Sequence, residues 1–166
     1  MQSKLIKTIA VRVPAFAKLT GHLFSPKDYY ETERLFRGYR RSEVNEETGT
    51  LEANSIRFPD FSCNWSRFST PPEVLHRENS RPGDGCYSFS VLQARYKSMG
   101  TGCHDPLPKN YSHTEVRQLK PDEDVFTEPP KGRKLDKAKD GWLKSARLEY
   151  RQNIVFNMTI EIEARP

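Results

Sequence analysis

Residues 102–117, GCHDPLPKNYSHTEVR, place two His, a Cys, an Asp, a Glu, a Lys and an Arg within sixteen positions. Pro106 and Pro108 hold the first half of this stretch extended, because proline fixes its own φ and pushes the preceding residue toward β geometry. In the second half the side chains alternate, so one face of an extended chain carries His113, Glu115 and Arg117. The stretch predicts a shaped polar loop leading into a strand, a setting in which binding or catalytic groups are common.

Further strands are predicted on both sides of this stretch. Residues 86–92 alternate serine with apolar residues, and residues 154–163, IVFNMTIEIE, alternate apolar with polar residues, as in a half-buried antiparallel strand. Residues 146–151 are a candidate partner for that last strand. Residues 4–13 and 55–62 also have strand character, because β-branched or aromatic side chains are frequent in them.

Helices are predicted at two places by their start signals. Ser25 and Pro26 fit an N-cap followed by proline at the first helical position, which predicts a helix to about Arg34. Thr70 to Glu73 form a capping box, which predicts a short helix to about residue 77. Residues 118–141 are charged and lack periodicity, so we expect a long surface loop.

The irregular order of these elements excludes a regular βαβ alternation. It predicts an α+β fold with a mainly antiparallel sheet, two or three short helices and long loops. A length of 166 residues fits a single domain over residues 1–166.

Composition narrows the setting in which the protein works. No run approaches the roughly 20 apolar residues of a membrane span, so no membrane partner is expected. Lys4, Lys7 and Arg12 interrupt any apolar segment of a secretory signal, although an organelle transit peptide fits the composition. The three cysteines are odd in number and lack a C-x-x-C pair, which indicates a reduced, cytoplasmic protein.

The charge is unevenly distributed along the chain. Residues 1–41 hold nine Lys or Arg against three acids, whereas residues 42–60 hold one Arg against five acids. If the first segment forms one face, it could attract nucleic acid, with aromatic side chains stacking on bases. The expected nucleic-acid contacts are Arg34, Arg37, Arg40, Arg41 and Lys109. The alternative is an ordinary solvated basic surface.

The polar loop also allows an enzyme. Metal-independent cleavage of RNA needs a general base, a general acid and a cation for the phosphorane. The residue types that meet these needs are His104, His113, Glu115 and Arg117. Their spacing is not diagnostic, and a His in a polar loop is commonly a hydrogen-bonded structural group.

Fragments of a second enzyme pattern are present. The segments LFRGYRR and FSCNWSRFST, followed by a later carboxylate, resemble the Arg, Ser, Glu pattern of ADP-ribosyltransferases. The resemblance implies that Arg37 holds a dinucleotide, Ser69 supports the nicotinamide ribose, and Glu115 or a glutamate of residues 161–163 orients the acceptor. The EIE of residues 161–163 equally fits the solvent side of a strand.

A zinc site could draw on two cysteines and two histidines, namely Cys86, Cys103, His104 and His113. Their spacing matches no closed zinc motif, and isolated cysteines commonly behave as small buried hydrophobes. We therefore predict no metal and no other cofactor.

The succession YRR, SIRFPDFSCNW, PPEVL and HDPLPKNYSHTEV, within residues 35–117, resembles a group of small bacterial proteins of unassigned function from mobile or defence gene neighbourhoods. The resemblance implies a bacterial, cytoplasmic setting and draws attention to this middle segment. Together with the charge pattern, it leads us to expect a binding component for nucleic acid or a protein partner, as a subunit of a defence or mobile-element system. The alternative is a small enzyme or toxin, either a ribonuclease or an ADP-ribosyltransferase.

Overall fold

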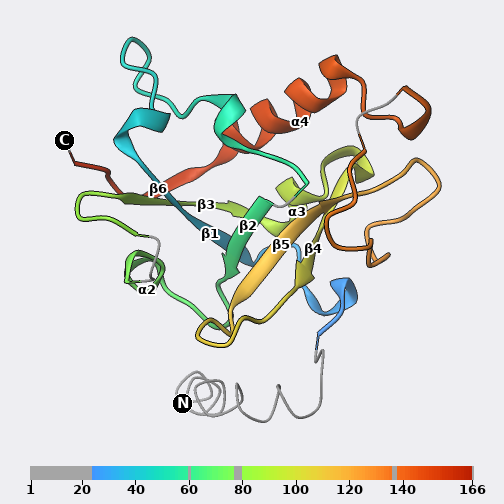
Figure 1. Cartoon of the computed structure of the whole chain (residues 1–166), viewed down its shortest axis with the longest axis horizontal. Coiled ribbons are helices and arrows are strands. Elements are labelled where there is room, and N and C mark those ends of the chain that lie inside the picture. The colour runs from blue at the N-terminus through green and yellow to red at the C-terminus, as the bar shows by residue number, and fades with distance from the viewer. Residues whose placement is uncertain (1–23, 60, 77–79, 136–137, 166) are drawn as a thin grey trace.

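The computed structural model describes residues 24–59, 61–76, 80–135 and 138–165. A six-stranded sheet lies at its centre, with strand order β4-β5-β2-β1-β3-β6 and every neighbouring pair antiparallel (Figure 1). The strands are β1 (Arg34–Tyr39), β2 (Phe61–Trp65), β3 (Gly85–Ser90), β4 (Gly100–His104), β5 (His113–Gln118) and β6 (Thr159–Ile162). The helices are α2 (Pro71–Leu75), α3 (Val91–Ala94) and α4 (Lys144–Asn157). The predicted α+β class is confirmed, and the strand predicted at 4–13 lies outside the described residues.

The two faces of the sheet differ in what covers them. The apolar face packs against α4 and forms the main core, which includes Leu35, Phe61, Trp65, Phe89, Val116, Tyr150 and Ile154. The opposite face carries a small second core, in which Phe36 and Cys86 pack against Val74 of α2. The rest of this second face is polar over β5, so the sheet is apolar on one side and partly charged on the other.

Tyr150 joins α4 to the sheet. Its hydroxyl donates a hydrogen bond to the carbonyl oxygen of Ala94, at 2.6 Å, at the end of α3. A Cβ atom on Gly100, at the start of β4, would lie only 2.4 Å from the Tyr150 hydroxyl oxygen. Glycine at this position therefore allows α4 to approach β4 closely.

The prediction of one continuous strand over residues 154–163 is wrong in its first half. Ile154 to Asn157 are the last turn of α4, and only Thr159–Ile162 form a strand. Tyr150 and Ile154, four residues apart, lie on the same face of a helix, and both are buried in the main core. The predicted partner strand at 146–151 is likewise part of α4. Ile154 is fully buried and Phe156 is 75% exposed, although these two side chains would share a face in a strand, so the burial fits only the helical period.

Two other boundaries also differ from the prediction. Ser25 and Pro26 begin only the 3-10 turn Pro26–Asp28, and Arg34 already belongs to β1, which pairs with strands on both sides. In the predicted strand 55–62, a cis peptide precedes Pro59, and pairing begins only at Phe61. Proline has no N–H to donate to a sheet, which is consistent with the late start of β2.

The remaining elements follow the expected signals. The capping box at Thr70 begins α2, and the strand predicted over 86–92 is β3, shortened by the start of α3 at Val91. His113 begins β5, as the alternation indicated. Among the described residues, no helix is long and apolar enough to cross a membrane.

The segment between β5 and α4 is irregular but anchored. Its described part contains the 3-10 turn Ala138–Asp140 and no strand or α-helix. Leu119, Leu135 and Trp142 are buried, and the Trp142 indole N–H donates to the carbonyl oxygen of Leu119 at 2.8 Å. These three apolar anchors hold the charged segment between them against the sheet and α4.

Candidate functional site

Charged side chains line one face of β5. Side chains alternate along a strand, so His113, Glu115 and Arg117 share this face, and their exposed fractions are 8%, 3% and 8%. The register places Asn64 of β2 beside His113 and Cys103 of β4 beside Glu115. Buried charges require partners, so the contacts of these three side chains decide what the face can do.

Glu115 lies between two cations. Arg117 Nε donates to Glu115 Oε2 at 3.0 Å, and Lys131 Nζ lies 3.5 Å from Glu115 Oε1. Arg117 Nη1 also donates to the carbonyl oxygen of Pro129 at 3.0 Å. These contacts attach the segment 129–131 to the charged face of β5.

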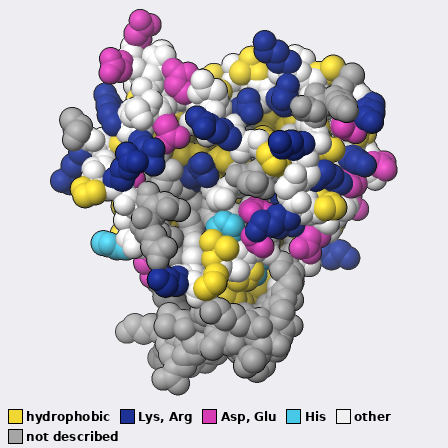
Figure 2. Space-filling model, in the orientation of Figure 1, with side chains coloured by type: hydrophobic (Ala, Val, Ile, Leu, Met, Phe, Trp, Pro, Cys, Tyr) yellow, Lys and Arg dark blue, Asp and Glu magenta, His cyan; other side chains and the backbone are white. Residues whose placement is uncertain are grey.

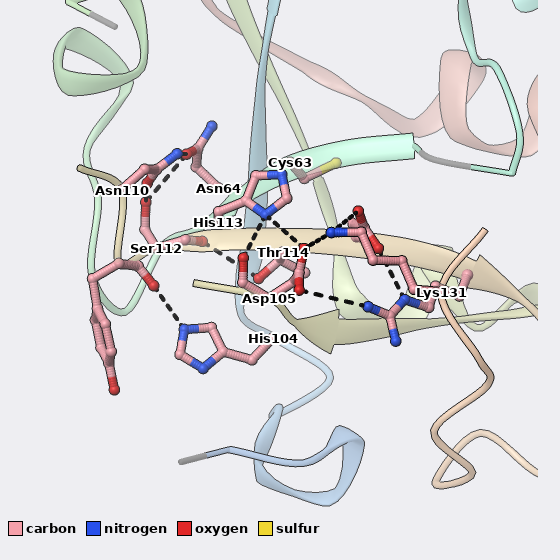
Figure 3. A network of polar contacts seen from close by, with 12 residues as sticks. Cys63, Asn64, His104, Asp105, Asn110, Ser112, His113, Thr114 and Lys131 are labelled. Carbon is pink, nitrogen blue, oxygen red and sulfur yellow. Dashed lines mark hydrogen bonds and ion pairs between the residues drawn. The ribbon is translucent and has the colours of Figure 1, made fainter. Parts of the chain in front are cut away.

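Asp105 follows β4 and completes the group. Its carbonyl oxygen lies 2.7 Å from His113 Nδ1, which must therefore carry a proton, since a carbonyl only accepts. Lys131 Nζ donates to Asp105 Oδ2 at 2.6 Å, and Arg117 Nη2 lies 3.9 Å from Asp105 Oδ1. We call Asp105, His113, Glu115, Arg117 and Lys131 the charged cluster (Figure 3).

The pKa of Asp105 reflects these partners. Burial by itself would raise this pKa, but the hydrogen bond from Lys131 and the charges of Lys131, His113 and Arg117 outweigh burial and lower it. A carboxyl group with a lowered pKa contributes stability above its ordinary pKa, and this contribution is lost as the pH falls through the lowered value. The cluster therefore stabilises the fold more at neutral pH than in acid.

Replacement of Lys131 tests this pH dependence. We expect Lys131→Met to lower the free energy of unfolding by about 0.5–1 kcal/mol at pH 7, a small effect because the ammonium group is largely exposed. The difference from wild type should shrink as the pH falls below about 4, the ordinary pKa of an aspartate, because the unfolded chain then takes up a proton that Asp105 in the folded protein does not yet bind. Urea unfolding between pH 7 and pH 3 measures it, with the exposed Lys27→Met as the control. A difference that is the same at every pH would contradict the assignment to Asp105.

The loop between β4 and β5 is fixed by side-chain amides. Asn110 Nδ2 donates to Asn64 Oδ1 at 2.8 Å, and Ser112 Oγ lies 2.8 Å from Asn110 Oδ1 (Figure 3). Leu107 and Asn110 pair through their backbones across the turn. Pro106 and Pro108 predict a shaped loop, and side-chain hydrogen bonds to β2 hold this loop in place.

His104 lies apart from the charged cluster. It precedes Asp105 but points to the other side of the sheet, where its Nε2–H donates to the carbonyl oxygen of Tyr111 at 2.7 Å. Its ring packs against Phe24, Trp65 and the Tyr111 ring, with centroids 5.4, 5.7 and 4.9 Å away. The structure therefore brings together three of the four residues considered for catalysis, and places His104 in an aromatic environment.

The groups of the charged cluster make ion pairs and hydrogen bonds that attach the segment 129–131 to β5, and they are not positioned for proton transfer. Both oxygens of Glu115 face cations, and His113 Nδ1 is committed to the Asp105 carbonyl oxygen. A general base must instead reach the proton of a bound substrate. The ribonuclease interpretation stays a prediction.

The arginines of β1 do not share a surface. Arg34 donates from Nε to Ser88 Oγ and from Nη2 to Thr159 Oγ1, both at 3.0 Å, on the partly polar face. Arg37 lies on the other face, where its guanidinium stacks 4.7 Å above the Phe61 ring. Three positions separate the two arginines, and in a strand that spacing places them on opposite sides.

The other expected nucleic-acid contacts are exposed but scattered. Arg40 and Arg41 follow the end of β1, whereas Lys109 lies in the loop between β4 and β5. Together with the arginines of β1, they do not form the single basic face that the charge of residues 1–41 suggested. For the ADP-ribosyltransferase pattern, Arg37 likewise lies on the face of the sheet opposite to Glu115.

The residues considered for zinc are also separated. Cys86 lies on β3, three strands away from the β5 residue His113, and Cys103 and His104 point to opposite faces of β4. All three cysteines are free and buried, and burial raises the pKa of each thiol to about 12. Within the described ranges, no three His, Cys, Asp or Glu side chains come close enough together to hold a metal.

A basic pocket lies at the other end of β5. It has a volume of about 80 Å³, and its apolar wall is formed by Phe58, Pro59 and Leu135. Gln118 closes one side, since its side-chain amide exchanges two hydrogen bonds with the backbone of Leu135, at 3.0 and 3.1 Å. The cationic wall consists of Lys134, Arg147 and Arg151.

In the part of the chain that the structure describes, the cations of this pocket have no anionic partners. No ion pair or side-chain hydrogen bond joins Lys134, Arg147 or Arg151 to another described residue, and Arg151 Nε is buried without a hydrogen-bond partner. Burial, and then the nearby charge of Arg147, lower the pKa of Arg151. By contrast Arg133, next to Lys134, donates to both oxygens of Glu123, at 2.7 and 2.5 Å. Among the described residues, the positive charge of the pocket thus has no anionic partner.

The N-terminal end of α4 adds to this charge. Its first turn contains no acidic residue, although acidic side chains are favoured there by the helix dipole. Lys144, Arg147 and Arg151 follow one another at spacings of three and four residues, so they share one side of the helix. We call Lys134, Lys144, Arg147 and Arg151 the basic face.

One signal for the basic face was present in the sequence. Residues 131–151 hold eight Lys or Arg against three acids, a surplus of five charges and as large as that of the whole chain. The surplus of six charges in residues 1–41 is larger and favours that segment instead. The spacing of four between Arg147 and Arg151 places them on one side of a strand as well as of a helix, whereas Lys144 joins that side only in a helix.

Comparison with protein-family models, curated proteins and solved structures finds no significant match to this chain.

Proposed function

We propose that this protein is a binding component for a polyanion, with nucleic acid as the chemical class, and that the basic face makes the contact. The observation that carries the proposal is the lack of anionic partners around Lys134, Arg147 and Arg151 among the described residues. Cations that repel one another are stabilised when an anion binds between them. Figure 2 shows Lys and Arg side chains gathered over the part of the molecule where α4 lies.

Helix geometry supports the same conclusion. The positive end of the α4 dipole and the cations of its first two turns act in the same direction, so both attract negative charge. The proposal places the contact on α4 instead of on β1, because Arg34 and Arg37 already donate to groups of the sheet. The bacterial, cytoplasmic setting and a role in a defence or mobile-element complex are part of this proposal and follow from the resemblance described above.

Salt dependence tests the proposal. We expect the affinity for a short oligonucleotide to fall steeply with salt, because phosphate contacts release counterions. Lys144→Ala combined with Arg147→Ala should reduce the slope of log affinity against log salt by about 2, one for each lost contact. Fluorescence anisotropy at several salt concentrations measures this slope.

The control removes two charges elsewhere. Arg81→Ala combined with Arg165→Ala changes exposed side chains near the start of β3, and the slope should stay at the wild-type value. Loss of folding would not explain weaker oligonucleotide binding by the Lys144→Ala, Arg147→Ala variant. Removing a cation from the N-terminal end of a helix stabilises the helix by about 0.3–1 kcal/mol. A flat salt response, or binding of a protein partner without nucleic acid, would refute the polyanion assignment.

A further inference from the structure

We propose that the basic pocket is a site for a phosphate monoester dianion, in which Lys134, Arg147 and Arg151 hold the phosphate against the Phe58 and Pro59 wall. This inference rests on the proposed function, and it assigns the end of a nucleic-acid strand, or a free mononucleotide, as the source of the phosphate. The basic face attracts phosphates in general. The pocket within it selects a phosphate group by its charge and shape.

The charge of the pocket favours a dianion. Three cations line it, and two of them are guanidinium groups, whose paired N–H donors match phosphate oxygens in a bidentate geometry. A phosphate monoester carries about −1.5 to −2 charges at pH 7 and presents three terminal oxygens. A phosphodiester carries a single charge, so it neutralises less of the charge of the pocket.

The shape of the pocket favours a terminal group. A volume of about 80 Å³ is well below the roughly 300–1,000 Å³ of pockets that enclose a drug-sized ligand. A small recess of this kind receives the end of a chain, whereas an internal phosphate has sugar attached on both sides. The apolar wall beside the cations gives the adjoining sugar or base a surface to pack against.

The wall is held in place before any ligand binds. The Phe58 ring contacts Phe61, Trp142 and Tyr150, with ring centroids 6.1, 5.5 and 5.6 Å away. Gln118 fixes the backbone at Leu135, next to Lys134. A site whose walls are already positioned binds with little loss of conformational entropy.

Arg151 supplies a hydrogen-bond donor that lacks an acceptor. Its Nε atom is buried and makes no hydrogen bond, and a buried donor without a partner is unfavourable. Arg147, one helical turn before it, also donates no side-chain hydrogen bond to a described residue. Phosphate oxygens entering the pocket would supply acceptors to both arginines.

The test compares strands that differ only at one end. A short oligonucleotide labelled at one end is prepared with either a phosphate or a hydroxyl at the other, in both polarities, and its binding is followed by anisotropy. We expect wild type to bind one phosphorylated end roughly ten-fold more tightly than the hydroxyl end, equivalent to one additional charge-assisted contact. Equal affinities for phosphorylated and hydroxyl ends in both polarities would overturn the strand end as the source.

Variants locate the preference in the pocket. Arg151→Gln and, separately, the exposed Lys134→Ala should reduce the ten-fold preference to less than about two-fold. The Arg81→Ala and Arg165→Ala control should keep the full preference. Because Lys134 is exposed, its replacement leaves the fold intact even if the Arg151 variant is destabilised. A preference that survives in the folded Lys134 variant would place the phosphate elsewhere.

A direct titration separates this inference from the proposed function. Isothermal titration with a nucleoside monophosphate and with inorganic phosphate requires no oligonucleotide. Binding that disappears in Lys134→Ala, in a protein that binds no oligonucleotide, would support the phosphate pocket with a free nucleotide as the source and reject the polyanion function. Oligonucleotide binding that depends on salt, without any end preference or phosphate binding, would support the function and overturn the pocket.

Discussion

Replacing Glu115 by Ala is expected to lower the free energy of unfolding by about 3–5 kcal/mol, the cost of removing one partner from a buried ion pair. The Glu115 side chain is only 4% exposed and lies against the guanidinium of Arg117, itself 10% exposed. Without the carboxylate, the buried guanidinium loses its nearest counter-charge while it stays out of water. Urea unfolding at pH 7 measures the loss.

Two further variants identify the cause of this loss. Glu46→Ala removes an exposed carboxylate and should change the free energy of unfolding by no more than about 0.5 kcal/mol. Glu115→Leu combined with Arg117→Met replaces the pair by apolar side chains of similar size, and should recover most of the stability. If Glu115→Ala unfolds at the wild-type urea concentration but abolishes an RNA-cleaving or dinucleotide-consuming activity, the charged cluster is an active site and our interpretation of it as structural is wrong.

The charged face of β5 could be predicted, whereas its burial could not. The alternation of His113, Glu115 and Arg117 fixes which side chains share a face, because the side-chain period of a strand is two. Alternation does not say which face is covered. The cover comes from the segment that carries Pro129 and Lys131, whose lack of periodicity gave no indication that it folds back onto β5.

Near the end of the chain, the alternation of side chains predicted the wrong element. Residues 154–163 satisfy the strand pattern along their whole length, yet Ile154 belongs to α4 and Ile160 to β6. A short apolar run fits either period, and its partners decide between them. Ile154 is buried in the main core whereas Phe156, which would share its face in a strand, is exposed, and this burial fits only a helix. Asn157 supports the helix by donating from Nδ2 to the carbonyl oxygen of Asn153.

The basic face that we propose as the contact could not be derived from the sequence either. Arg147 and Arg151, four residues apart, share a face in a strand as well as in a helix, so their spacing alone does not locate them on α4 or beside the pocket. The pocket needs, in addition, Lys134 and the Phe58 wall, which lie far away in the sequence. No local pattern contains that information, because it arises from the packing of α4 against the sheet.

Trp142 is the residue through which that packing can be tested most directly. Its ring is 1% exposed, lies 5.5 Å from both Phe58 and Tyr150 between centroids, and donates its N–H to the Leu119 carbonyl oxygen. Trp142→Ala should lower the free energy of unfolding by about 3–5 kcal/mol, since it removes a large buried ring and leaves a cavity. Urea unfolding followed by circular dichroism measures this loss.

A comparison with Trp142→Phe separates the ring from the hydrogen bond. The phenylalanine variant keeps most of the apolar volume and leaves the Leu119 carbonyl oxygen without its donor, so we expect a loss of about 1–3 kcal/mol. Because Trp142 supports Phe58, the alanine variant should also weaken phosphate binding under conditions in which it is still folded, whereas the phenylalanine variant should bind almost as wild type does. Equal stability of the two variants would mean that the apolar volume of the Trp142 ring contributes little to the free energy of unfolding.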